Sequence, residues 1–300
     1  MDIIIYADRD GGDLPHFWRS TGFSPASLLL NDDMQQQMIY AAATGGIEHV
    51  RIHYLLDLIQ ATGTGTSSVA YDWSALNVAL DVLVENRLRP FFELMGNPSG
   101  YFDDFTDDTQ LRAWRQLVYD LALHLINRYG ADTVRGWYFE SWNEPDAWWQ
   151  FGMDGYINYY DACSEGLKMA DESLRFGGPC TSETLSPYFK ALIAHCDSGT
   201  NYFTGESGVR LDFISIHEKG APPTREDITP NTLRICEKEL AAVTYIGEHH
   251  PRFAALPFMN NECDPQVGWQ QHHSWRGQPY YAAIVCRMIA QHLWWLHDEN

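Results

Sequence analysis

The stretch WYFESWNEPD, residues 137–146, indicates how this chain folds and where its chemistry lies. Its first half is aromatic and apolar and predicts a buried strand, yet it ends in Asn143, Glu144, Pro145 and Asp146. Burying a charge costs several kcal/mol or more unless the group is paired or its pKa shifts. A buried strand that delivers a carboxylate to its end is therefore either capped by solvent or directed at a functional site.

Other short apolar runs in the sequence also end in polar residues, and an amphipathic pattern usually follows. Together with the quoted stretch they predict seven strands, at residues 16–19, 49–54, 89–95, 136–142, 174–178, 211–217 and 256–262. Apolar residues spaced three and four apart fill the gaps between these runs. They predict a helix capped by Asp72 and running through Leu83, and further helices over 111–125, 156–170, 233–243 and 284–295.

Strands that alternate with helices imply parallel strands in βαβ units. Seven such units at roughly 40-residue spacing predict an α/β fold, a TIM (β/α)8-type barrel whose eighth strand is missing at the C-terminus. A doubly wound open sheet is the alternative, but no glycine-rich phosphate-binding fingerprint follows an early strand. We therefore expect residues 1–300 to form a single catalytic barrel domain that is truncated at its C-terminus.

The net charge of −20, from 40 acidic and 20 basic residues, limits the partners of the chain. Nucleic acid is not expected, because phosphate binding needs a basic face, and an anionic membrane surface is equally disfavoured. No apolar stretch approaches the length of a membrane span. The N-terminus, MDIIIYADRDGGD, lacks the pattern of a signal peptide, so we expect a cytoplasmic protein rather than a lysosomal or secreted one.

The cysteines and histidines show no metal-binding spacing. The six cysteines, at positions 163, 180, 196, 236, 263 and 286, contain no CxxC pair, and the 12 histidines contain no HExxH motif. We expect mostly buried free thiols in a reducing compartment. The sequence therefore predicts no metal site and no cofactor.

Two glutamates at predicted strand ends suggest a reaction. In a barrel the active site gathers at the C-terminal ends of the strands, where Glu144 of the fourth strand and Glu262 of the seventh are expected to converge. Glycoside hydrolysis needs such a pair, with a separation of about 5 Å for retention of configuration and about 6.5–9.5 Å for inversion. The environments of the two carboxyls must separate their pKa values, and we expect the apolar setting of Glu144 to raise its pKa.

Seven segments carry a resemblance to a known family. They are FWRSTGF (17–23), FELMG (92–96), FESWNEPD (139–146), NYYDACSEGL (158–167), TGESGVRLDFISIHEKGA (204–221), NNECDPQVGW (260–269) and YAAIVCRMIAQH (281–292). Through them the chain resembles glycoside hydrolase family 39, and within that family the α-L-iduronidases, from about Phe17 to the C-terminus. The set is highly specific, whereas an Asn-Glu-Pro motif alone occurs in many barrel glycosidases.

The resemblance implies a retaining exo-glycosidase that removes terminal α-L-iduronic acid from glycosaminoglycan-like glycans. Glu144 matches the general acid/base of the family and Glu262 its nucleophile. The positions that match residues in or beside the sugar pocket of the family are Arg51, His53, Asn143, His217 and Lys219. We further expect Lys219 and the N–H of Gly268 to donate hydrogen bonds to a uronic acid, Arg51 to support one of the glutamates, and Trp269 to wall the pocket.

Two alternatives stay open beside this interpretation. Related members of the family act on xylosides, so the substrate could be a β-xyloside, which has no C5 carboxylate. The family also continues beyond the position of Asn300 with an eighth strand and a β-sandwich domain, neither of which is present in this sequence. An inactive or carbohydrate-binding remnant is therefore the other alternative, although the retention of Glu144 and Glu262 argues against it.

Overall fold

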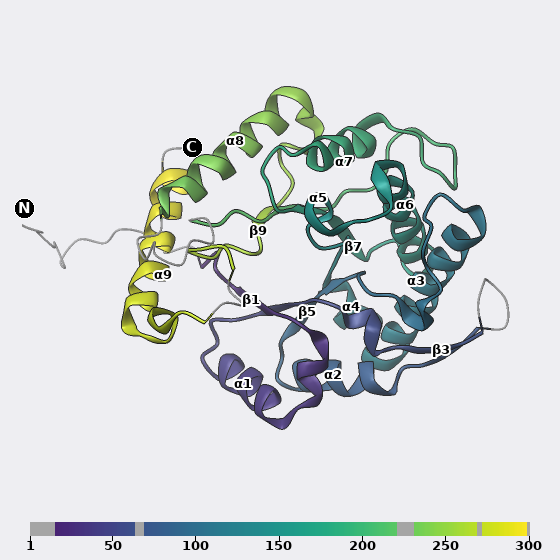
Figure 1. The fold of residues 1–300 in the computed structure, drawn as a ribbon, viewed down its shortest axis with the longest axis horizontal. Coiled ribbons are helices and arrows are strands. Elements are labelled where there is room, and N and C mark those ends of the chain that lie inside the picture. Colours follow the sequence, from purple (N-terminus) through teal and green to yellow (C-terminus); the bar gives the residue numbers. More distant parts are fainter. Residues whose placement is uncertain (1–15, 64–68, 221–230, 269–271, 299–300) are drawn as a thin grey trace, which may run out of the picture.

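The structure, a computed structural model, describes residues 16–63, 69–220, 231–268 and 272–298. Seven strands form one sheet in which every neighbouring pair runs parallel. In their order across the sheet they are β1 (Ser20–Phe23), β2 (His49–Ile52), β5 (Arg89–Glu93), β6 (Tyr138–Glu140), β7 (Arg175–Thr181), β8 (Ile214–Ile216) and β9 (Phe258–Asn260). Figure 1 shows the sheet curling around a centre, with helices on its outer side. This incomplete TIM-type barrel confirms the predicted fold class.

Helices follow most of these strands. They are α1 (Asp32–Ala43), α2 (Ser74–Glu85), α3 (Asp108–Tyr129), α4 (Ala131–Arg135), α5 (Pro145–Trp148), α6 (Gly152–Ala170), α7 (Pro187–Ser198), α8 (Leu233–His249) and α9 (Pro279–His292). The five predicted helices correspond to α2, α3, α6, α8 and α9. The α1 and α7 helices were not predicted. The predicted last helix continues past α9 only as a π-helical turn, Leu293–Asp298.

Two local predictions differ from the structure. The first strand was expected at residues 16–19, but pairing with β2 begins at Ser20, because Gly22 lets the backbones approach: an added Cβ there would lie 3.0 Å from the Arg51 carbonyl oxygen. Asp72 does accept the Ser74 N–H at 2.9 Å, but the N-cap position of α2 is Trp73. Asp72 itself ends β4 (Ala70–Asp72), which pairs antiparallel with β3 (Gln60–Thr62) in a small hairpin that the sequence analysis missed.

Two helices on the outer side of the sheet pack closely against each other. The α3 and α6 helices touch, and an added Cβ at Gly166 would lie 2.7 Å from the Arg115 carbonyl oxygen and 2.8 Å from Val118 Cβ. The Trp114 indole N–H donates to Cys163 Sγ across the same contact, at 3.1 Å. Interiors packed at this density tolerate little added volume. The α3 and α6 helices therefore form one closely packed pair.

The cysteines are free thiols, and most of them are buried. No cysteine is in a disulfide; Cys163, Cys180, Cys196 and Cys236 are buried, Cys263 is half-buried and Cys286 is exposed. This agrees with the prediction of mostly buried free thiols. In the part of the chain that the structure describes, no helix is both long and apolar enough to cross a bilayer.

Candidate active site

The C-terminal ends of four strands bring the predicted polar residues to one place. Arg51 lies in β2 and His53 directly follows it, the chain leaving β6 supplies Glu144, and the chain leaving β9 supplies Glu262. Lys219 follows β8 and contacts both glutamates. Parallel strands end at the same rim of a barrel, so residues far apart in sequence meet there.

Arg51 is the buried centre of the charge network. Its Nε donates to Glu140 Oε2 at 2.7 Å and its Nη1 donates to Glu262 Oε1 at 3.0 Å. The same guanidinium is ion-paired with Glu93 and donates to Asn143 Oδ1 at 3.1 Å. Burial alone would lower the pKa of Arg51, but the charges of Glu140 and Glu93 outweigh it and hold the pKa well above its ordinary value. Arg51 is therefore a permanent cation that joins three strand ends.

Glu144 is held in a conformation that a side chain rarely adopts. Its φ of 43° lies in the left-handed region, at the position just before α5 begins with Pro145. Its N–H donates to the Cys180 carbonyl oxygen at 3.0 Å, which ties the turn to β7. Left-handed conformations of non-glycine residues cost about 1–3 kcal/mol and occur often at functional sites. The surrounding structure thus fixes where this carboxyl points.

The two glutamates share one cation. Lys219 Nζ lies 3.0 Å from Glu144 Oε1 and 2.8 Å from Glu262 Oε2. His217 Nδ1 lies 2.9 Å from Glu144 Oε1 and 3.6 Å from Glu262 Oε2, and one carboxylate oxygen of each glutamate lies within 4.8 Å of the other. His53 Nε2 contacts the remaining oxygen of Glu262 at 3.1 Å. The arrangement places two acids side by side without leaving either unpaired.

These neighbours decide the protonation of Glu144. Burial alone would raise the pKa of Glu144, but the hydrogen bond with His217 and the charge of Lys219 lower the pKa to about 2. Burial lowers the pKa of His217 itself, and the charge of Glu262 and the hydrogen bond with Glu144 oppose that effect. The expectation that an apolar setting raises the pKa of Glu144 is therefore wrong for this structure, because His217 and Lys219 lie against the carboxyl.

The neighbouring cationic and hydrogen-bonding side chains also keep Glu262 ionised. Burial opposes its ionisation, but the charge of His217, the hydrogen bond with His53 and the charge of Arg51 hold its pKa well below the usual range. The pKa of Lys219 is raised, because the charges of Glu262 and Glu144 outweigh burial. A carboxylate kept ionised in this way suits a nucleophile.

The sequence analysis missed several members of this network. Glu140 accepts from Arg51, from Ser215 Oγ at 2.5 Å and from Asn261 Nδ2 at 2.7 Å, and it is fully buried. Trp148 donates its indole N–H to Glu144 Oε2 at 2.9 Å. A glutamate inside an apolar strand was a visible signal for Glu140. Trp148 lies four residues after Glu144. This spacing indicates a side-chain contact only if the segment is known to be helical, as it is in α5.

Gly268, a predicted sugar-binding position, does not join the network formed by the described residues. Gly268 is buried, with a φ of 83°, but no contact among the described residues links it to Glu144, Glu262 or Lys219. Trp269 lies outside the described residues.

A cleft opens beside the candidate pair. Its volume is about 330 Å³, and Trp148, which contacts Glu144, is part of its wall. The residues that line it are Tyr54, Gly96, Asn97, Phe102, Phe105, Trp142, Trp148, Trp149, Gln150 and Phe151. Aromatic walls with a few polar groups are typical of sites for small organic ligands. The cleft therefore adjoins Glu144 on the side of its indole contact.

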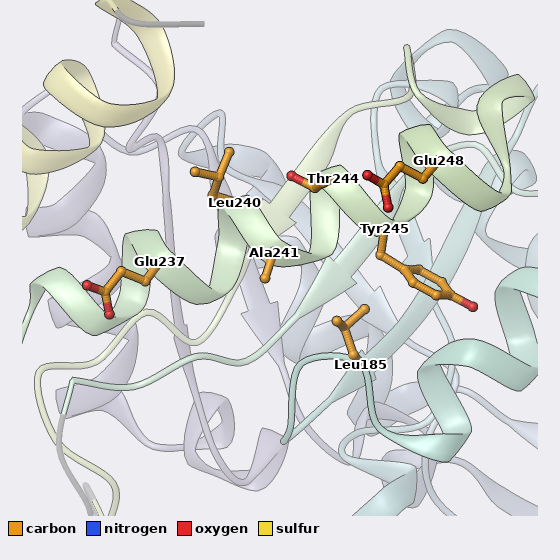
Figure 2. Close-up of a pocket in the computed structure, with 7 residues that line it drawn as sticks. All are labelled: Leu185, Glu237, Leu240, Ala241, Thr244, Tyr245 and Glu248. Carbon is orange, nitrogen blue, oxygen red and sulfur yellow. The ribbon is translucent and has the colours of Figure 1, made fainter.

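A second hollow, of about 490 Å³, lies against α8 (Figure 2). Figure 2 shows Leu185 on the side of α8 to which Ala241 and Tyr245 point, with Glu237 and Glu248 near the two ends of the labelled row. None of the residues of the charge network lines it. The hollow is therefore separate from the candidate catalytic residues.

Residues 1–297 match the family model described as glycosyl hydrolases family 39. The chain is 45% identical over 292 residues to α-L-iduronidase of Mus musculus and 44% identical over 295 residues to α-L-iduronidase of Homo sapiens. These matches cover 92% and 93% of this chain but 45% and 44% of the relatives, so the chain spans about half the length of the curated relatives it matches. A β-xylosidase of Caldicellulosiruptor saccharolyticus is 30% identical over 234 residues, 73% of this chain and 46% of that protein.

Solved structures agree with these matches. A structure described as the bacterial orthologue of human α-L-iduronidase superposes with a TM-score of 0.91 at 52% identity, over 96% of this chain and 47% of that one. A β-xylosidase from Caulobacter crescentus, with a TM-score of 0.67 at 24% identity over 84% of this chain and 53% of that one, shows the shared fold alone. Because the family model covers nearly the whole chain, this protein belongs to glycoside hydrolase family 39.

Proposed function

We propose that residues 1–300 act as one catalytic unit, the active-site barrel of a retaining exo-glycosidase for terminal α-L-iduronic acid in glycosaminoglycan-like glycans. The observation that carries the proposal is the shared cation: Lys219 Nζ lies 3.0 Å from Glu144 and 2.8 Å from Glu262. Retaining glycosidases place their two carboxyls about 5–5.5 Å apart, and inverting enzymes about 6.5–9.5 Å apart. Carboxylate oxygens within 4.8 Å of each other favour retention.

In the proposed reaction the two glutamates have different roles. Glu262, held ionised by Arg51 and His53, attacks the anomeric carbon and forms a glycosyl ester while the glycosidic bond breaks. Glu144 gives its proton to the leaving oxygen, then takes a proton from the water that hydrolyses the ester. After the first step Glu262 is a neutral ester and Glu144 is an anion, and hydrolysis of the ester restores the anionic Glu262 and the protonated Glu144.

This cycle requires the pKa of Glu144 to rise when sugar binds. In the free chain the pKa is about 2, with His217 and Lys219 against the same oxygen. A sugar lying between the glutamates would draw the ammonium of Lys219 away from Glu144, and burial would then raise the pKa of the carboxyl. A lysine ammonium has three donors, so Lys219 can bond Glu262 and the sugar together.

The sugar carboxylate needs cations, and this favours a second candidate function. Four carboxyl groups, those of Glu93, Glu140, Glu144 and Glu262, surround the two permanent cations Arg51 and Lys219. A neutral xyloside would meet no repulsion from this ring, and the chain is 30% identical to a β-xylosidase. A β-xylosidase is therefore the second candidate. Lys219 and the Gly268 N–H remain the proposed donors for a uronic acid.

The test is hydrolysis of aryl α-L-iduronide beside aryl β-D-xyloside by the chain and its Glu262→Gln variant. We expect iduronide cleavage by the chain and a loss of at least about a thousandfold in the variant, since the covalent step is removed. Glu206→Gln, an exposed glutamate, is the matched control and should keep full activity. Xyloside cleavage alone would support the second candidate.

Binding measurements, together with the variant, distinguish a chain that only binds the sugar from a hydrolase whose nucleophile is wrongly assigned. If the folded chain cleaves neither sugar but binds iduronic acid, the carbohydrate-binding alternative replaces the hydrolase. If Glu262→Gln cleaves iduronide as fast as the chain itself, the assigned nucleophile is wrong.

A further inference from the structure

A second group of metal-ligating side chains lies where α8, α9 and the loop after β9 meet. Glu239 comes from α8, Cys263 directly follows Glu262, and His292 ends α9. One ligand atom from each of Glu239, Cys263 and His292 lies within 4.8 Å of the other two. Among the described residues, no side-chain contact links Glu239, Cys263 or His292 to the network around Arg51. Their closeness needs its own explanation.

The carboxylate of this group is oriented by a fixed amide. Asn260 Nδ2 donates to Glu239 Oε1 at 2.7 Å and to the Glu218 carbonyl oxygen at 3.0 Å. The other oxygen of Glu239 then faces His292 Nε2, at 2.9 Å. Partners of this kind, which hold one atom of a ligand so that the other is presented, accompany most metal sites.

The imidazole of the group is oriented in the same manner. His292 Nδ1 lies 2.7 Å from the Met288 carbonyl oxygen, which can only accept, so Nδ1 carries the hydrogen. In the chain as described a hydrogen on Nε2 bridges the ring to Glu239 Oε2 at 2.9 Å, and a bound metal would take the place of that hydrogen. A backbone carbonyl that binds one ring nitrogen is the usual way to select the other as a metal ligand.

A fourth ligand lies within reach. Cys236 is three residues before Glu239 on α8, so the two side chains share a face of the helix. The His292 side chain is hydrogen-bonded to the thiols of both Cys236 and Cys263. Cys236 is fully buried and Glu239 is 3% exposed, beside the apolar cluster that includes Ile235. A carboxylate and two thiols in such a setting lack water to solvate them.

We propose that Cys236, Glu239, Cys263 and His292 form a tetrahedral Zn²⁺ site. Two sulfur ligands, one nitrogen and one oxygen make a donor set that favours Zn²⁺ over Mg²⁺ or Ca²⁺. Tetrahedral bonds of the usual lengths would place the ligand atoms about 3.4–3.8 Å apart, so the atoms of Glu239, Cys263 and His292, which lie within 4.8 Å of one another, need only a small contraction. Cys236 would have to move in to complete the set. The inference does not depend on the proposed hydrolysis.

The site would position the candidate nucleophile. Cys263 is bonded to Glu262 through the backbone, and β9 forms an edge of the described sheet. A metal that joins Cys263 to α8 and α9 ties this edge to two helices. Cys263 would therefore act on Glu262 by fixing its backbone, without touching the sugar.

The experiment is metal binding by the whole chain, purified under reducing conditions and freed of metal by a chelator. We expect one equivalent of Zn²⁺, measured by competition with a chromogenic chelator, and a rise in melting temperature. Replacement by Co²⁺ should give the intense visible bands of a tetrahedral centre and a near-ultraviolet thiolate-to-cobalt band. Cys263→Ala should lose the thiolate band in part and weaken Zn²⁺ binding by at least about tenfold.

Matched variants locate the metal. Cys286→Ser, an exposed cysteine of α9, should leave binding unchanged. So should His249→Ala, because His249 also contacts the carbonyl four residues back but is exposed. His292→Ala should lose affinity as Cys263→Ala does, and near-ultraviolet circular dichroism shows whether each variant is folded.

Three results would overturn the proposal. Zn²⁺ binding that survives both Cys263→Ala and His292→Ala excludes these ligands. Binding that is lost instead in Glu262→Gln places the metal between Glu144, His217 and Glu262, the other described group with suitable spacing. Absence of stoichiometric binding by the folded chain means that the cluster is a hydrogen-bonded contact between α8, β9 and α9.

Discussion

The two candidate catalytic glutamates stand in unlike parts of the molecule. Glu144 belongs to the packed half, which we define as β5, β6 and β7 with α3 and α6. Glu262 belongs to the edge half, defined as β8 and β9 with α8 and α9. In α6 ten residues are buried, whereas in α9 only Ile284 and Met288 are, and all three residues of β9 are half-buried. The proposed acid is placed by packing, and the proposed nucleophile mainly by charged contacts.

Arg51 joins the two halves, which makes its removal the largest expected effect. Arg51→Met removes the guanidinium that pairs with Glu93 and Glu140 of the packed half and with Glu262 of the edge half, and only Glu262 keeps a second permanent cation, Lys219. Breaking a buried pair from one side costs about 3–5 kcal/mol, so we expect a loss of that size in the free energy of unfolding. Urea titration measures it.

The control for that variant is Arg112→Met, which breaks an exposed pair with Asp108 and should cost less than about 1 kcal/mol. Adding Glu140→Gln to Arg51→Met should recover part of the loss. Equal losses in Arg51→Met and Arg112→Met would show that the two halves are not joined through this residue.

Glu93 tests the packed half through the pH dependence of stability. Burial, opposed by Arg51, raises the pKa of Glu93 from 4.5 to about 7. Between those values the folded chain keeps a proton that the unfolded chain has released, so stability falls as pH rises from about 4.5 to 7. At about 1.4 kcal/mol per pKa unit the fall amounts to at most about 3.5 kcal/mol.

Glu93→Gln should flatten this fall, since the amide does not titrate, and Glu172→Gln on the surface should not. Free energies of unfolding from urea titrations across the same pH range make the comparison. A slope that is unchanged in Glu93→Gln would assign the pH dependence to another group.

Two helical glycines compare the packing of the halves directly. An alanine Cβ at Gly166 of α6 would lie 2.7 Å from a backbone oxygen, whereas at Gly247 of α8 nothing lies within 4 Å. Gly166→Ala should cost about 1–3 kcal/mol by overpacking. Gly247→Ala should stabilise by about 0.5–1 kcal/mol through helix propensity. Thermal unfolding of the two variants measures both, and shifts of the same sign would contradict the contrast between the halves.

The smallest expected effect concerns the choice of sugar. Below neutral pH Glu93 gains a proton, and the pKa of His53 is raised, because the charge of Glu93 and the hydrogen bond with Glu262 outweigh burial. The ring therefore becomes more positive as pH falls. From about pH 8 to about pH 5, kcat/KM for the anionic iduronide should rise severalfold relative to the neutral xyloside. If the ratio does not change with pH, the charged residues around Arg51 and Lys219 do not recognise the sugar carboxylate.

The sequence predicted most of the sheet because its signals are local. Each strand is a short apolar run, and α3 shows its buried stripe at Leu111, Trp114 and Val118. The α1 helix was missed because it buries only Met38 and shows no stripe. The α7 helix had usable signals, a capping Ser186 followed by Pro187, which were not read.

The sequence predicted which residues form the candidate site but not their pKa values. Strand-end positions pointed to Glu144 and Glu262, since chemistry gathers at one rim of a barrel. The lowered pKa of Glu144 was not predictable, because it depends on Lys219, which is 75 residues away in sequence and close only after folding. The proposed zinc ligands are likewise brought together only by the packing of α8, α9 and the loop after β9, so no sequence motif predicts them.

The measurement that tests the central assignment most directly is covalent trapping. The chain is incubated with a 2-deoxy-2-fluoro glycosyl fluoride of iduronic acid, or of xylose in parallel, and the labelled peptide is sequenced by mass spectrometry. The account predicts one sugar ester on Glu262, formed in Glu206→Gln and absent in Glu262→Gln. A label on Glu144 or on another residue, or a product of inverted configuration, would contradict it.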